Sequence, residues 1–98
     1  MDTFEKILLD YGSYVLICVR YVFKETEEYE RCAEINKVLK KYNVSTTMTA
    51  EDWQAEMWRR GTSGEAAMCN AKAYFYNAMK MCDKAGMLDK FKKKYRTK

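Results

Sequence analysis

The chain contains no proline, and only four of its 98 residues are glycine. These two residues most often end helices and form turns, because proline lacks an amide hydrogen and glycine adopts left-handed backbone angles. Their scarcity favours long uninterrupted helices over a turn-rich β fold. A chain of 98 residues suffices for one domain, and its 48% hydrophobic content can supply the core. We therefore expect a single all-α domain over residues 1–98.

The segment over residues 2–24 has helical periodicity. It opens with Asp2 and Glu5, which match a capping box with aspartate as the cap. An alternative is a strand over residues 14–23, because the stretch "YVLICVRYVF" is rich in β-branched and aromatic residues and Gly12 provides a break before it. The helix is favoured because apolar side chains recur every three or four residues, at Phe4, Leu8, Tyr11, Val15, Cys18 and Val22.

Charge order and capping residues mark the other helices. The stretch "TEEYERCAEINKVLKKYN" carries glutamates at its front and lysines at its back, which is the order that favours the helix dipole. Threonine caps begin the next two helices, and Gly61 and Gly86 end them. The pattern leaves open whether residues 1–42 form one bent helix or a hairpin. We expect a compact all-α bundle of four or five helices, at about residues 2–24, 26–42, 50–60, 63–85 and 87–96.

One local stretch resembles the repeat unit of a known family. The sequence "YNAMKMCDKAGMLDKF", residues 76–91, resembles the helix–turn–helix stretch of pentatricopeptide repeats, with "KAG" as the turn. The resemblance covers 16 residues and implies a helical hairpin that turns at Gly86. It does not extend to recognition of single-stranded RNA, because that function needs several stacked repeats and the chain has no repeat period.

Histidine is absent from the chain, and its four cysteines are more than ten residues apart. Zinc sites need closely spaced cysteine or histidine ligands, and the Ser-His and Cys-His arrangements of nucleophilic catalysis need a histidine. The cysteines lie on or beside the apolar stripes, as small buried side chains do. We expect no enzymatic activity, no catalytic residue, no metal site and no cofactor.

Glutamate pairs at helical spacing are the remaining motif with possible chemistry. Glu27 with Glu30 could share a Mg²⁺ ion, and helical pyrophosphatases of the MazG type use carboxylate pairs of this kind. The second Glu-x-x-Asp pair of that family is missing, because Gln54 stands three residues after Glu51. Complementarity to the helix dipole explains the glutamates, so a metal-dependent hydrolase is the third hypothesis.

The most apolar run, over residues 14–23, is ten residues long and contains Arg20. A helix needs about 20 apolar residues to cross a bilayer. The start of the chain does not read as a secretory signal, because Asp2 and Glu5 occupy the place of its basic region. We expect a cytoplasmic protein with reduced thiols and without a membrane partner.

The two tryptophans are predicted to face different ways. Trp53 has Met57 one turn later, as a core residue would, whereas Trp58 lies about 140° further round the helix. Tryptophan and arginine dominate binding hot spots. We therefore predict a protein-interaction site at Trp58, Arg59 and Arg60, and the alternative is that Trp58 is covered within the monomer.

Basic residues suggest a second candidate surface. Residues 84–98 carry a net charge of +6, whereas residues 1–83 carry −2. A concentrated positive patch attracts polyanions, although lysines also belong at helix ends. Docking of Phe91 and Tyr95 on the core, with the lysines aiding solubility, is favoured over nucleic-acid binding. The candidate anion-binding residues are Lys72, Tyr76 and Lys80 on one helix face, with Lys92, Lys93, Lys94 and Arg96 in the C-terminal segment.

These observations favour a small non-enzymatic interaction or accessory protein, of the inhibitor or adaptor type, that binds a protein partner or forms a homo-oligomer. The alternative is a nucleic-acid or nucleotide binder that uses the basic residues.

The alternative makes a prediction about salt. If the basic segment binds nucleic acid, affinity for an oligonucleotide should fall steeply with salt, because phosphate contacts release counterions. Deleting residues 92–98 should then abolish binding in a titration. Binding that survives the deletion, or no binding at all, would contradict this hypothesis.

Overall fold

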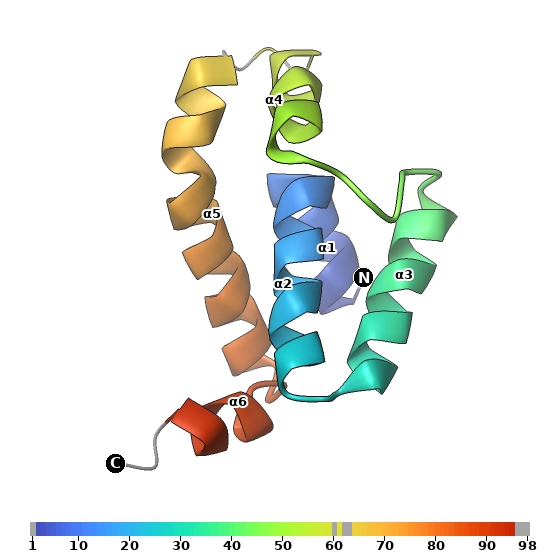
Figure 1. Cartoon of the computed structure of the whole chain (residues 1–98), viewed down its shortest axis with the longest axis vertical. Helices are drawn as coiled ribbons and strands as arrows, with labels where there is room; N and C mark the ends of the chain where they lie inside the picture. The colour runs from blue at the N-terminus through green and yellow to red at the C-terminus, as the bar shows by residue number, and fades with distance from the viewer. Residues whose placement is uncertain (1, 60, 62–63, 96–98) are drawn as a thin grey trace.

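The computed structural model describes the backbone of residues 2–59, 61 and 64–95. Over these residues the chain forms six α-helices and no β-strand, which confirms the all-α prediction (Figure 1). The strand alternative for residues 14–23 is wrong, because these residues lie inside a helix. The helices are α1 (Thr3–Tyr11), α2 (Ser13–Glu25), α3 (Tyr29–Lys41), α4 (Ala50–Arg59), α5 (Gly64–Lys84) and α6 (Asp89–Tyr95).

Helix α2 is the central element of the bundle. It lies between α3 and α5, with α1 behind it, while α4 and α6 lie near its two ends (Figure 1). Phe4 near the start of α1 contacts Phe23 near the end of α2 edge to face, with ring centroids 5.9 Å apart. Arg20 of α2 donates to Asn36 of α3 over 2.6 Å. The chain therefore folds back twice within residues 3–41, which resolves the choice between a bent helix and a hairpin.

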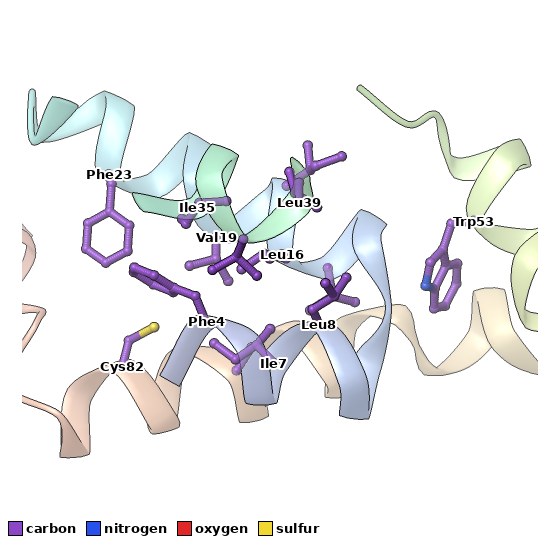
Figure 2. Close-up of a cluster of buried hydrophobic side chains, with 14 of the residues drawn as sticks. Phe4, Ile7, Leu8, Leu16, Val19, Phe23, Ile35, Leu39, Trp53 and Cys82 are labelled. Carbon is purple, nitrogen blue, oxygen red and sulfur yellow. The ribbon is translucent and has the colours of Figure 1, made fainter. Parts of the chain in front are cut away.

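The core consists of apolar side chains from all the helices that surround α2. Phe4, Ile7 and Leu8 come from α1, and Ile35 and Leu39 from α3. Figure 2 shows Phe23 and Cys82 at one end of this cluster and Trp53 of α4 at the other. Removal of apolar surface from water is the main force that holds such a bundle together. The residues of α2 that reach this core are Val15, Leu16, Ile17, Val19 and Phe23.

Gly12 divides the predicted helix over residues 2–24 into two. Its φ of +93° and ψ of 171° belong to a backbone region that is essentially restricted to glycine. A β-carbon at this position would lie 3.1 Å from Nε1 of Trp53, so the site also lacks room for a side chain. The prediction of one helix over residues 2–24 is therefore wrong. The apolar periodicity continues through Gly12, but the backbone turns at this residue.

Trp53 fills the space next to this turn. Its side chain is fully buried, and its Nε1 donates a hydrogen bond to the carbonyl oxygen of Tyr11 over 3.2 Å. The indole also packs against Tyr14, with ring centroids 5.7 Å apart, and against Tyr74 of α5 at 6.2 Å. Trp53 thus satisfies a carbonyl at the end of α1 and joins α4 to three other helices.

Left-handed residues end three of the helices. Glu27, Asn43 and Gly86 have φ of 60°, 60° and 74°, and they follow α2, α3 and α5. At each end the next residue's N–H donates to a carbonyl five residues earlier, for example Met87 to Cys82 over 3.0 Å. The predicted helix stop at Gly86 is confirmed.

Glu5 ties α1 to the end of α3. Its Oε2 accepts hydrogen bonds from the Tyr42 hydroxyl over 2.7 Å and from the Lys41 ammonium group over 3.1 Å. Tyr42 first and Lys41 second lower the pKa of Glu5 below its ordinary value, because both favour the charged carboxylate.

Gly12→Ala should destabilise the protein more than Gly86→Ala. Alanine at position 12 combines a strained backbone with overlap on the buried Trp53 ring, so we expect a loss of about 3 kcal/mol in the free energy of unfolding. Position 86 has positive φ but open space, so its variant should lose about 1 kcal/mol. Urea denaturation measures both losses, and equal losses would contradict the role of Trp53.

Glu5→Gln should remove a pH-dependent part of the stability. Because folding lowers the pKa of Glu5, its contribution is present above the unfolded value near 4.5 and is lost as pH falls through the folded value. The wild type should therefore exceed the variant in stability at pH 7, and the difference should vanish in acid. Denaturation at several pH values tests this prediction. Tyr42→Phe removes the hydrogen bond that lowers the Glu5 pKa most, so the stability of this variant should depend less on pH than that of the wild type.

Candidate functional site

Helix α2 carries a second apolar stripe beside the one that forms the core. Tyr14, Cys18, Tyr21 and Val22 follow one another at helical spacing on this side. Tyr21 is 58% exposed, and the other three side chains are partly exposed. Soluble helices normally place polar residues on the outer face, so this stripe is unusual.

Helices α5 and α6 turn the outer stripe into a groove, which we call the α2–α5 groove. It has a volume of about 460 Å³ and a predominantly apolar lining. Its two charged residues, Glu25 and Lys72, are both exposed. The lining residues are Tyr14, Cys18, Tyr21, Val22 and Glu25 of α2, Ala71, Lys72 and Phe75 of α5, and Phe91 of α6.

The thiol of Cys18 and the phenol of Tyr14 in the groove both have raised pKa values. Burial raises the pKa of the Cys18 thiol, so this group stays protonated and weakly nucleophilic near neutral pH. The pKa of Tyr14 is raised as well, chiefly by the neighbouring Cys18. Burial likewise raises the pKa of Cys32, and that of Cys82 to about 11. None of these shifts activates a nucleophile.

The predicted interaction site on α4 is exposed. Trp58 is 66% exposed, which confirms the orientation that helical spacing predicted for it. Arg59 is exposed beside it, and Arg60 lies outside the described residues. Trp58 and Arg59 border a shallow hollow together with Glu51, Gln54 and Ala55. The binding role of this surface stays a prediction.

The three residues of the predicted anion-binding face on α5 have different surroundings. Lys72 forms part of the wall of the α2–α5 groove. Tyr76 is 60% exposed, but the Lys80 ammonium group lies 4.7 Å from the centre of its ring. This cation–π contact occupies a ring face on which a base would otherwise stack.

The basic residues of α6 are partly engaged within the chain. Lys92 forms an ion pair with Asp83, and Lys94 donates to the carbonyl oxygen of Glu25 over 2.9 Å. Lys93 is exposed, and Arg96 lies outside the described residues. Phe91 packs against the core, so the predicted docking of the closing helix is confirmed for this side chain, and Leu88 just before the helix is buried as well. The side chain of Tyr95 lies outside the described part.

The described residues include neither a cluster of metal ligands nor a membrane-spanning helix. In the part of the chain that the structure describes, no three His, Cys, Asp or Glu side chains gather as metal ligands would. The described helices also include none with the length and apolar character of a bilayer-spanning segment.

Sequence reasoning missed the α2–α5 groove, although a signal for it was present. Within "YVLICVRYVF" nine of ten residues are apolar or aromatic, which is more than one core-facing stripe can use. The surplus residues, Tyr14, Tyr21 and Val22 among them, are those that line the groove.

Comparisons of the chain with protein-family models, with curated proteins and with solved structures returned no match. The geometry of its own residues therefore carries the functional argument.

Proposed function

We propose that the protein is a small non-enzymatic interaction protein that holds a helix of a partner in the α2–α5 groove. The observation that carries the proposal is the outer apolar stripe of α2, in which Tyr21 remains 58% exposed. Exposed apolar surface is costly in water, and contiguous patches of it mark interaction sites.

The form of the groove supports a helix as the bound element. The groove is lined along α2 from Tyr14 to Glu25, and α5 and Phe91 of α6 supply the rest of its lining. Amphipathic helices bind in grooves of this kind through apolar residues at helical spacing. Exposed Glu25 and Lys72 can orient such a helix by pairing with charges on its edges.

Nucleic-acid binding has weaker support. The α2–α5 groove is lined mainly by apolar side chains, whereas a phosphate backbone needs a row of available cations. Lys80, Lys92 and Lys94 are already engaged with Tyr76, Asp83 and Glu25. The protein-interaction function is therefore the better account of the described surface.

Photo-crosslinking from the groove tests the proposal. Replacing Tyr21 with benzoylphenylalanine keeps an aromatic group at an exposed groove position. Tyr29 of α3 is a matched control, because it is 63% exposed and lies outside the groove. After irradiation in the cells that make the protein, position 21 should link to one defined protein chain, either another copy or a different protein.

Mass spectrometry of the linked product then identifies the partner. We expect a strong product from position 21 and little from position 29. A groove that does not bind protein would give no product at position 21, or the same nonspecific products at both positions.

A further inference from the structure

The outer face of α4 is itself an amphipathic surface. Glu51, Gln54, Ala55, Trp58 and Arg59 are spaced as neighbours on one side of a helix and border one shallow hollow. The opposite side of α4 is held by Trp53, which is fully buried. Helix α4 therefore uses one tryptophan inside the monomer and presents the other to solvent.

We propose that the α2–α5 groove binds the outer face of α4 from a second copy of this chain. The inference rests on the proposed function and names its partner. A contact within one chain is excluded, because Trp53 anchors α4 beyond the N-terminal end of α2 and Trp58 is exposed on the side of α4 away from the core.

Charge complementarity supports this partner. The α4 face has Glu51 near its N-terminal end and Arg59 at its C-terminal end, separated by about 12 Å along the helix. The groove offers Lys72 on the α5 wall and Glu25 at the end of α2. Glu51 can thus pair with Lys72, and Arg59 with Glu25, in one orientation of the bound helix. The reverse orientation would place like charges together.

The apolar parts also correspond. Trp58 protrudes beside Arg59 at the C-terminal end of the α4 face, and the small side chain of Ala55, one turn earlier, permits close approach. Tyr21 and Phe75 offer aromatic rings in the groove, so the indole can pack on them. Trp58 becomes buried in this contact with Arg59 beside it, and both residue types are enriched in interface hot spots.

The contact joins two different surfaces of the same chain. Such a contact closes as a dimer if it is made twice about a two-fold axis, and it extends into a chain of subunits if it is not. Both outcomes raise the mass in solution with concentration.

Sedimentation equilibrium of the full chain, from about 1 µM to about 1 mM, tests the proposal. The wild type should self-associate within this range. Trp58→Ala should weaken association by at least about 30-fold, and Glu51→Lys and Lys72→Glu should each weaken it by about tenfold. Two samples are decisive: a chain that carries both charge reversals, and a mixture of the two single variants. In each sample, residues 51 and 72 again have opposite charges at the contact. Association in each sample should return to within about threefold of the wild type.

Matched controls separate this contact from general stickiness. Tyr29→Ala removes an equally exposed aromatic ring, and Glu30→Lys reverses a charge outside both surfaces, so neither should change the mass. Circular dichroism checks that each variant is folded. A wild type that stays monomeric, association that survives Trp58→Ala, or a charge exchange that fails to restore it would overturn the inference. A crosslink from position 21 to a different protein would also overturn it, while leaving the groove's proposed function intact.

Discussion

The contact between Trp53 and the backbone at Gly12 is the constraint on which the arrangement of the helices depends. Its indole bonds the last carbonyl of α1 and fills the space that a side chain at Gly12 would need. The turn at Gly12 brings Phe4 back onto Phe23 and makes α2 the centre of the bundle. The same indole packs on Tyr14, which also lines the groove. One buried side chain thus links the turn, the core and the candidate binding surface.

The double apolar character of α2 connects fold to function. A central helix needs one apolar stripe for the core, and Val15, Leu16 and Val19 supply it. Of the outer stripe, Tyr14 also packs on Trp53, whereas Cys18, Tyr21 and Val22 lie outside the core cluster, and exposed apolar surface of this kind lowers solubility. Under the proposed function, the helix of a partner covers these residues. The raised pKa of the Cys18 thiol and the small number of charged residues in the groove agree with the proposed binding function, because neither activates Cys18 as a nucleophile.

Features set by local chemistry could be predicted from the sequence. Asp2 accepts the Glu5 N–H over 2.8 Å as the capping pair indicates, and Gly86 ends α5. The outward direction of Trp58 followed from helical geometry alone. The turn at Gly12 could not be predicted in this way, because it depends on Trp53, which is distant in sequence. The groove was missed for a related reason: periodicity assigned Cys18 and Val22 to the core, and only the packing of α5 and α6 shows which α2 residues remain outside.

Nuclear magnetic resonance can test directly whether Trp58 takes part in self-association while Trp53 stays in the core. The indole N–H groups of Trp53 and Trp58 give separate signals, and a dilution series compares them in one sample. The Trp58 signal should shift with protein concentration together with the Val22 methyl signals, while the buried, hydrogen-bonded Trp53 signal should stay fixed. Concentration-dependent shifts that spare Trp58 and Val22 and fall elsewhere on the surface would contradict the account, as would a spectrum that does not change with concentration.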